Sequence, residues 1–242
     1  MTCFIEEKTL PSPILAAFWH GLKSVLPIIL GYLPVGFAYG VLAQKSGLSL
    51  FNTVAMSVIV YAGSAQLIGI GLIAGGAGAL ALIFTTFIVN LRHLLMSAAL
   101  APKLSDWKKW QITLFTGEMT DETFALHSLR MAEHNPPKAE TFTINLLAHL
   151  SWIAGSVAGF LAGGQIADVR PIGLDYALPA MFIALLVPQV LKPFYLAMAV
   201  CAAALSVTLL LAGFSRANVI FATIICATCG ACLDTWIKRK SS

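Results

Sequence analysis

The sequence predicts an all-α, polytopic transmembrane helical bundle with about seven spans. Of its 242 residues, 58% are hydrophobic and only 11% are charged, whereas a soluble domain carries about 25% charged residues. The apolar residues gather in runs close to the roughly 20 residues that a helix needs to cross about 30 Å of hydrocarbon. The charged residues lie mostly between these runs. These observations place the chain, residues 1–242, in a single transmembrane domain.

The apolar runs define the expected spans and their interruptions. In chain order the spans are Lys23–Ala43, Phe51–Ile73, Ala77–Ala101, Phe142–Ala162, Tyr176–Leu191, Phe194–Ala212 and Ala217–Ile237. The first, with Pro27 and Pro34, and the fifth, with Pro179 and Pro188, are expected to be interrupted, because proline removes a backbone donor. Paired interrupted spans are typical of transporter repeats, although chance also produces them. The second span is expected to be a plain crossing.

The polar segments decide the orientation of the bundle. Residues 1–22 precede the first span, and residues 102–140 form a polar segment with an amphipathic stretch at 113–131. This stretch either lies on the surface or re-enters the membrane, and its pattern alone slightly favours the surface. The basic tail at 238–242 predicts a cytoplasmic C-terminus. The net charge of +4 comes from residues at the ends of apolar runs, so a nucleic-acid interface is not expected.

Arg92 is the residue of the third run that costs the most free energy to insert into a membrane. An arginine at the centre of a spanning helix costs roughly 2.5–3.5 kcal/mol on insertion scales. Arg92 lies two residues after Asn90 and directly before His93, and an apolar stretch follows. It either snorkels to the cytoplasmic interface or faces the bundle interior, where it holds a substrate carboxylate or pairs with a buried acid. We favour the interior, because the apolar residues that follow make snorkelling harder.

Other polar groups interrupt the apolar pattern. Asp121 and Glu122 follow Thr120 in a helix-capping pattern; inside the bundle they could bind a substrate amine or exchange protons. Tyr61 and Gln66 offer hydrogen-bonding groups within the second run, and Gln66 could simply tie two helices together.

Cysteine and glycine spacing indicate packing rather than metal binding. Cys226, Cys229 and Cys232 recur every three residues, but on a helix in lipid they do not form a closed tetrahedral set. We therefore expect no metal and no cofactor. Gly155, Gly159 and Gly163 recur every four residues, a spacing that predicts close contact with another helix.

Several strings occur together in a recognisable order. They are Tyr32-Leu-Pro34 with Gly40, Tyr61-Ala-Gly-Ser-Ala-Gln66, Arg92-His93, Thr120-Asp121-Glu122-Thr-Phe-Ala125, and Ser151-Trp152 with Gly155 and Gly159. This ordered set resembles the AzlC family, the large subunits of two-component branched-chain amino-acid exporters. The resemblance covers most of the chain, and the order is more specific than any single string.

The resemblance implies a multi-pass permease of the bacterial cytoplasmic (inner) membrane. Such a permease exports valine, leucine, isoleucine and sometimes methionine, coupled to protons, with a small AzlD-type membrane subunit. The candidate positions it carries over are Tyr32, Pro34, Gly40, Tyr61, Gln66, Arg92, His93, Asp121 and Glu122. Some relatives carry an acid where this chain has Asn90. A proton-carrying role that such an acid has in those relatives is therefore not assigned to Asn90.

Two other classes of function compete with the exporter. An intramembrane enzyme such as a hydrolase would need a nucleophile and a base; Ser64 or Ser97 with His93 or His149 is the available set, but no nucleophile motif accompanies it, so we do not expect an enzyme. A passive solute channel would conduct without regard to the proton gradient.

Overall fold

The computed structural model describes residues 13–168, scattered positions between 171 and 190, residues 193–213 and residues 218–241. The described residues form helices, turns and loops without a β-strand, which confirms the all-α class. Four described helices are long and apolar enough to cross a membrane, at residues 15–45, 79–104, 138–163 and 193–211. The predicted interruption of the fifth span falls largely on residues outside the described part.

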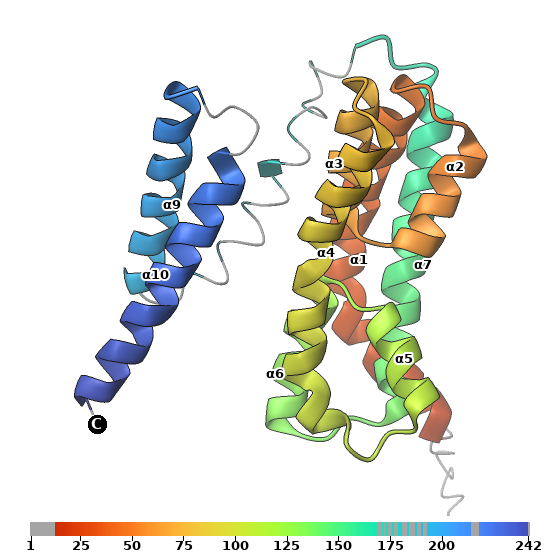
Figure 1. Cartoon of the computed structure of the whole chain (residues 1–242). Helices are drawn as coiled ribbons and strands as arrows, with labels where there is room; N and C mark the ends of the chain where they lie inside the picture. Colours follow the sequence, from red (N-terminus) through yellow and green to blue (C-terminus); the bar gives the residue numbers. More distant parts are fainter. Residues whose placement is uncertain are drawn as a thin grey trace, which may run out of the picture. The chain divides into compact units, whose positions relative to one another are not determined.

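The contacts divide the chain into residues 1–182 and 183–242, each described by itself. The second unit contains α9 (Pro193–Leu211) and α10 (Asn218–Ser241), which pack as an antiparallel pair (Figure 1). Gly230 of α10 lies against Met198 of α9. The prediction of a single transmembrane domain stays a prediction.

The first unit is built on two parallel helices, α1 (Pro13–Lys45) and α7 (Lys138–Gly163). We call them the frame. Gly21 of α1 lies against Thr143, and Gly163 of α7 lies against Gln44, so both helices run in the same direction. The frame therefore has a Ser24 end, where both helices start, and a Gln44 end.

Glycines bring the backbones of the frame into contact. A Cβ on Gly36 would lie 2.9 Å from the Trp152 carbonyl oxygen, and one on Gly155 would lie 2.7 Å from the Leu33 carbonyl oxygen. At Gly40 and Gly159 an added Cβ would overlap the opposite backbone. The predicted packing role of the α7 glycines is confirmed.

The expected interruption of the first span is wrong. Helix α1 continues through Pro27 and Pro34 over 33 residues. A proline removes one backbone hydrogen bond, and neighbouring helices let membrane helices tolerate that loss. Helix α1 contacts α7 at Gly21, Gly36 and Gly40, so the packing of the two helices extends past both prolines.

The predicted plain crossing at Phe51–Ile73 is also wrong, because the chain reverses in its middle. Helix α2 (Leu50–Ala55) continues as a π-helical turn, η1 (Met56–Val60), and after Tyr61 and Ala62 the chain returns as α3 (Gly63–Ala74). We call residues 50–74 the first hairpin. It is apolar on both arms, so hydropathy alone does not distinguish it from a crossing.

Side-chain contacts fix the direction of each arm of the first hairpin. Thr53 of α2 accepts a hydrogen bond from the Tyr39 hydroxyl at 3.1 Å, next to the Gln44 end of the frame. Gly69 of α3 lies near Leu82, at the start of α4 (Ala79–Leu100). Helix α3 thus runs back beside α4 towards the Gln44 end, while α4 continues towards the Ser24 end (Figure 1).

A second hairpin enters from the Ser24 end. After a short 3-10 turn, η2 (Ala101–Leu104), it consists of α5 (Lys109–Gly117) and α6 (Asp121–Glu133), joined by residues 118–120. We call residues 109–133 the second hairpin. Arg130, near the end of α6, donates to Ser24 at 2.9 Å and pairs with Glu140.

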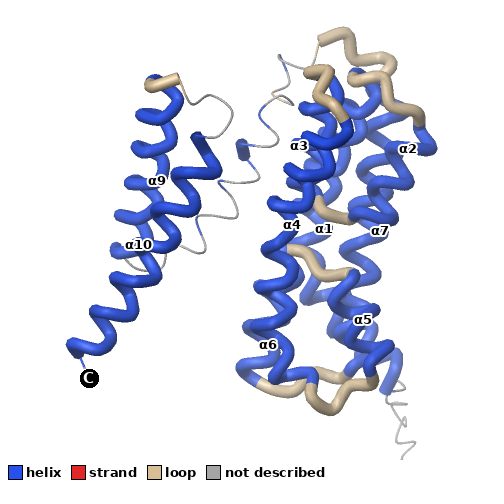
Figure 2. Tube along the Cα trace, in the orientation of Figure 1, coloured by secondary structure: helices blue, strands red, loops and turns tan. Residues whose placement is uncertain are grey.

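The tip of the second hairpin packs inside the bundle, whereas Leu114 and Leu129 on its outer face are exposed. This arrangement favours the re-entrant interpretation of residues 113–131 over the surface one. Phe115, Thr123 and His127 are fully buried. Figures 1 and 2 show the loops of the two hairpins near the middle of the frame, with their open ends towards opposite ends of it.

Candidate functional site

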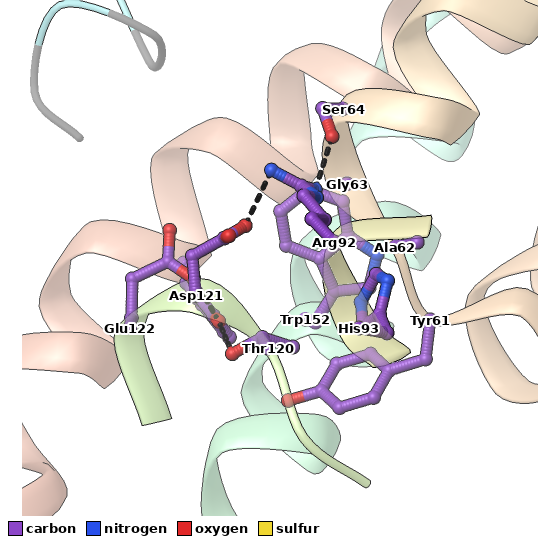
Figure 3. Close-up of a pocket in the computed structure, with 11 residues that line it drawn as sticks. Tyr61, Ala62, Gly63, Ser64, Arg92, His93, Thr120, Asp121, Glu122 and Trp152 are labelled. Atoms are coloured by element: carbon purple, nitrogen blue, oxygen red, sulfur yellow. Dashed lines mark hydrogen bonds and ion pairs between the residues drawn. The ribbon is translucent and has the colours of Figure 1, made fainter. Parts of the chain in front are cut away.

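A small cavity lies where the tips of the two hairpins meet (Figure 3). Its volume is about 20 Å³, enough for roughly one water molecule. It is lined by residues from both hairpins and from all three long helices of the unit: Tyr32, Tyr61, Ala62, Gly63, Ser64, Arg92, His93, Thr120, Asp121, Glu122 and Trp152.

The tip of the first hairpin has a strained backbone. Tyr61 follows the π-helical turn with φ 40° and ψ 46°, in the left-handed region. A bulky residue there costs of order 1–3 kcal/mol, and such strain gathers at functional sites. The Tyr61 hydroxyl is buried without a hydrogen-bond partner, so this tip offers a free polar group at the cavity.

Glycine at the next helical position brings α7 close to this tip. A Cβ on Gly63 would lie 2.7 Å from the Trp152 ring. The Trp152 indole donates to the Gln66 side-chain oxygen at 3.1 Å, and the Gln66 amide donates to Ser57 at 3.3 Å. Gln66 thus lies behind the cavity and ties α7 to both arms of the first hairpin.

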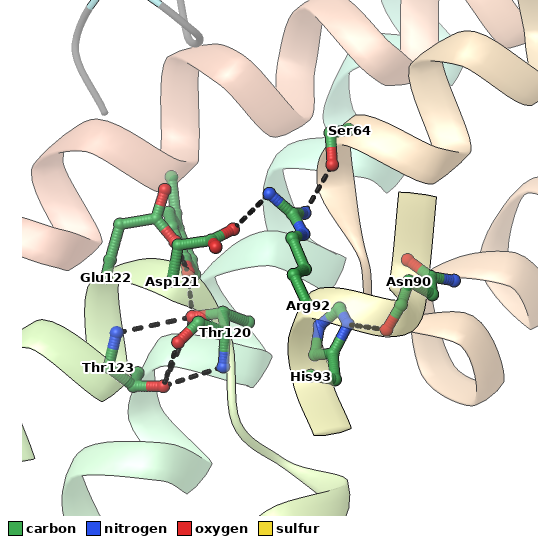
Figure 4. Close-up of polar contacts among 9 residues, drawn as sticks. Ser64, Asn90, Arg92, His93, Thr120, Asp121, Glu122 and Thr123 are labelled. Atoms are coloured by element: carbon green, nitrogen blue, oxygen red, sulfur yellow. Dashed lines mark hydrogen bonds and ion pairs between the residues drawn. The ribbon is translucent and has the colours of Figure 1, made fainter. Parts of the chain in front are cut away.

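Arg92 points into the bundle and joins the two tips. Its guanidinium lies 2.6 Å from Oδ2 of Asp121, at the start of α6. It also donates to the hydroxyl of Ser64, in the first turn of α3 (Figure 4). Its Nε is buried and has no hydrogen-bond partner. One cation therefore bridges an acid of the second hairpin and the helix start of the first.

The acidic tip of the second hairpin is a capped helix start. Thr120 accepts a hydrogen bond from the Thr123 amide, and Thr123 accepts one from the Thr120 amide at 2.8 Å, which confirms the predicted cap. Glu122 accepts a hydrogen bond from the Tyr32 hydroxyl at 2.6 Å. Asp121 and Glu122 thus have separate partners on α4 and α1.

The two helix starts at the cavity differ in electrostatics. Both α3 and α6 direct the positive end of a helix dipole towards it. In α6 the cap and two acids balance that charge, whereas the N-cap of α3, Ala62, makes no side-chain cap hydrogen bond. The α3 start, beside Arg92, is therefore suited to an anion, and the α6 start to a cation.

The remaining candidates lie at or beyond the edge of the cavity. His93 lines it, and its Nδ1 is 3.1 Å from the Asn90 carbonyl oxygen. The Asn90 side-chain oxygen is buried without a partner and borders a separate, more open pocket. Pro34 is exposed on α1, outside the cavity lining.

Two residues at the junction are not among the substrate and coupling residues that the sequence predicts. Glu118, in the second tip, lies 2.8 Å from Nδ1 of His149 on α7. The sequence suggests His149 only as the base of a hydrolase, and Glu118 lies within the amphipathic stretch at 113–131. The only signal was the dense spacing of Glu118, Asp121 and Glu122.

Comparison with known proteins identifies the chain. The family profile described as "AzlC protein" matches residues 27–166, more than half of the sequence. The chain belongs to the AzlC family. The matched region contains both hairpins and every residue of the cavity. No solved structure matches the chain.

Relatives of this AzlC-family chain are named as membrane proteins. It is 30% identical over 234 residues to "Inner membrane protein YgaZ" of Escherichia coli strain K12, covering 94% of this chain and 93% of the relative. It is 31% identical over 182 residues to "Branched-chain amino acid transport protein AzlC" of Bacillus subtilis strain 168, covering 75% and 71%. An uncharacterized membrane protein of Archaeoglobus fulgidus is 32% identical over 225 residues, covering 91% and 95%. With its long apolar helices, the chain is a multi-pass membrane protein.

Proposed function

We propose that this AzlC-family protein is a permease that exports branched-chain amino acids across the bacterial inner membrane. The name of the Bacillus subtilis relative supports the substrate class. The observation that carries the proposal is the Arg92–Asp121 ion pair between two opposed helix starts. A zwitterionic solute needs a cation and an anion side by side, because neither of its charges enters hydrocarbon unpaired.

The charges suggest how the backbone of the amino acid binds. The carboxylate would lie at the α3 start, where Ser64, the free Nε of Arg92 and the unpartnered Tyr61 hydroxyl can donate to it. The ammonium would lie at the α6 start, between Asp121 and Glu122. The Arg92–Asp121 ion pair is thereby replaced by two ion pairs with the substrate, one between Arg92 and its carboxylate and one between Asp121 and its ammonium. Neither residue is left without a counter-ion.

The apolar part of the substrate also has partners at this site. The rings of Tyr61 and Trp152 and the methyl of Ala62 line the cavity. Burial of a branched side chain contributes about 0.8 kcal/mol per CH₂ group. A valine, leucine or isoleucine side chain fits this chemistry, whereas a charged side chain would lack a counter-ion.

A cavity of about 20 Å³ is too small for any amino acid, so the described conformation corresponds to a closed site. The topology suggests how the site opens. A long helix followed by a hairpin occurs as α1 with the first hairpin and, in the opposite direction, as α4 with the second. Movement of one tip would expose the site towards one end of the frame only, which is the requirement for alternating access.

The proposal includes proton coupling and a small AzlD-type membrane subunit, both implied by the family resemblance. The hydrolase alternative has weaker support, because the Ser64 hydroxyl accepts from Arg92 and the His93 Nδ1 faces a backbone carbonyl. Neither contact activates a nucleophile.

Counterflow in proteoliposomes tests the proposal. Purified protein, with and without the AzlD-type subunit, is reconstituted into vesicles loaded with unlabelled leucine, and labelled leucine is added outside. We expect transient accumulation of label, competed by valine and isoleucine and unaffected by lysine or glutamate. Label that only equilibrates would indicate a channel, and no uptake of any branched-chain amino acid would refute the proposal.

A further inference from the structure

His149 contacts the tips of both hairpins. Its Nε2 lies 2.9 Å from the carbonyl oxygen of Ser57 in the first hairpin, and its Nδ1 lies 2.8 Å from Oε2 of Glu118 in the second. The Tyr61 ring stacks on the imidazole, with centroids 3.9 Å apart. One side chain of the frame therefore touches both elements that enclose the cavity.

The two contacts of His149 have different proton requirements. A carbonyl oxygen only accepts, so Nε2 carries a hydrogen. Between Nδ1 and Glu118 one further proton is needed, either on the imidazole or on the carboxyl group. Without it, lone pairs of nitrogen and oxygen would face each other at 2.8 Å. The link from α7 to the second hairpin thus depends on one proton, whereas the link to the first does not.

The charged neighbours of this pair are already engaged. The Tyr61 ring contacts His149, and the other titratable and charged groups of the adjoining cavity are Tyr32, Arg92, His93, Asp121 and Glu122. Arg92 and Asp121 balance each other at 2.6 Å, and Glu122 accepts from Tyr32 at 2.6 Å. Asp121, one of the two acids that the sequence suggests for proton exchange, has an arginine counter-ion, whereas no arginine among the described residues pairs with Glu118.

Access differs between the two members of the pair. The side chain of His149 is 11% exposed, whereas that of Glu118 is 27% exposed. Glu118 also follows Gly117, in the loop between α5 and α6. A proton can therefore reach the carboxylate from the more open side and be shared with the enclosed imidazole.

We propose that Glu118 and His149 form the proton-binding pair of this transporter and that their shared proton latches the second hairpin to α7. The inference rests on the proposed function and names the group that couples it to protons. With the proton bound, α7 holds both tips and the site is closed. Loss of the proton releases the second hairpin alone, which opens the site towards the Ser24 end of the frame.

Proton movement linked to leucine efflux tests the latch. Vesicles containing the protein, leucine and the pH dye pyranine are diluted into leucine-free buffer at equal pH, with the membrane potential clamped. In the wild type, efflux should bring protons in and acidify the lumen. Because glutamine does not titrate and its amide can donate to Nδ1 without an added proton, Glu118→Gln should lower this leucine-linked proton entry at least about tenfold.

The matched control is Glu133→Gln, which removes an exposed acid of the same hairpin and should leave proton entry and leucine counterflow unchanged. Wild-type proton entry in Glu118→Gln would overturn the inference. If Glu118→Gln also loses counterflow, Glu118→Asp decides: the inference requires this titratable variant to recover coupled proton entry, and equal loss in both variants overturns it.

The outcomes separate this inference from the proposed function. Wild-type counterflow without proton entry would refute the latch and leave the permease intact. An absence of counterflow in the wild type would refute the permease itself.

Discussion

The two hairpins reach the same cavity with opposite chemistry. The first, residues 50–74, contains no Asp, Glu, Lys, Arg or His, whereas the second, residues 109–133, contains three acids at and beside its tip. The first supplies a strained backbone, an uncapped helix start and hydroxyl groups. The second supplies carboxylates held by partners on α1, α4 and α7. A zwitterion can thus be recognised by one neutral and one charged element.

This difference has a consequence for movement. The neutral hairpin is tied to the frame by Gln66, Ser57 and Trp152, whose hydrogen bonds do not depend on pH. The acidic hairpin is tied by ion pairs and by a shared proton, which a substrate or a change in pH can replace. The second hairpin is therefore the one expected to respond to the substrate and the proton.

The largest expected effect tests whether Arg92 joins the two elements. Arg92→Gln leaves Asp121 without a counter-ion, and loss of one partner from a close charge pair costs about 2–5 kcal/mol. We expect leucine counterflow to fall about 100-fold, and less in Arg92→Lys, which keeps the charge but not the fork. Initial rates across a range of leucine concentrations provide the measurement.

The double variant Arg92→Gln with Asp121→Asn controls for simple misfolding. Its thermal stability should recover relative to Arg92→Gln, because no unpaired carboxylate remains. Wild-type transport in both single substitutions of Arg92 would show that its charge and fork are not needed at the site.

A second prediction concerns a variant that places a carboxylate in the neutral first hairpin. Ala62→Asp places a carboxylate at the N-cap of α3, beside Arg92, where the substrate carboxylate is expected. An N-cap acid stabilises a helix by about 0.5–2 kcal/mol, whereas like charge against the substrate should weaken leucine binding about 30-fold. Thermal unfolding followed by gel filtration and a leucine binding isotherm check both parts. Ala62→Asn, a neutral cap of similar size, should retain more binding, and equal loss in the two variants would argue against charge as the cause.

A third prediction concerns the free hydroxyl of the first tip. Tyr61→Phe keeps the ring, its stack on His149 and the backbone conformation, and removes only a buried hydroxyl without a partner. Stability should hold or rise slightly, because an unsatisfied buried polar group costs about 1–3 kcal/mol. The half-saturating leucine concentration should rise about tenfold if the hydroxyl donates to the substrate carboxylate. An unchanged value would remove Tyr61 from the binding set.

The sequence predicted the features that arise from local pattern. Composition identified a helical membrane protein, the four-residue glycine spacing predicted a close contact of α7 with another helix, and Thr120 identified a helix start. The insertion cost of Arg92 drew attention to an inward-facing arginine, and the structure places a half-buried acid opposite it. Each of these follows from residues close together in the chain.

Other features depend on contacts that a local pattern does not contain. The reversal at Tyr61 was missed because an apolar hairpin and an apolar crossing have the same hydropathy. The pattern left open whether residues 113–131 lie on the surface or re-enter the membrane, because the partners of their acids come from α1, α4 and α7. His149 gains its role from Ser57 and Glu118, which are 92 and 31 residues away.

The smallest expected effect distinguishes the contribution of the Ser64 hydroxyl to substrate binding from that of the backbone amides in the first hairpin. Ser64→Ala removes one neutral acceptor of Arg92, and a typical hydrogen bond contributes about 1 kcal/mol, or roughly a fivefold change in affinity. If the α3 start binds the substrate carboxylate through its amides, this variant should raise the half-saturating leucine concentration only about fivefold. Ser64→Gly serves as the comparison, because it removes the same hydroxyl and also loosens the helix start, and should weaken binding further. A loss of binding as large as that of Arg92→Gln would mean that the serine hydroxyl, and not the helix start, positions the guanidinium. The first hairpin would then not bind the substrate through its backbone, and the proposed difference between the two hairpins would be refuted.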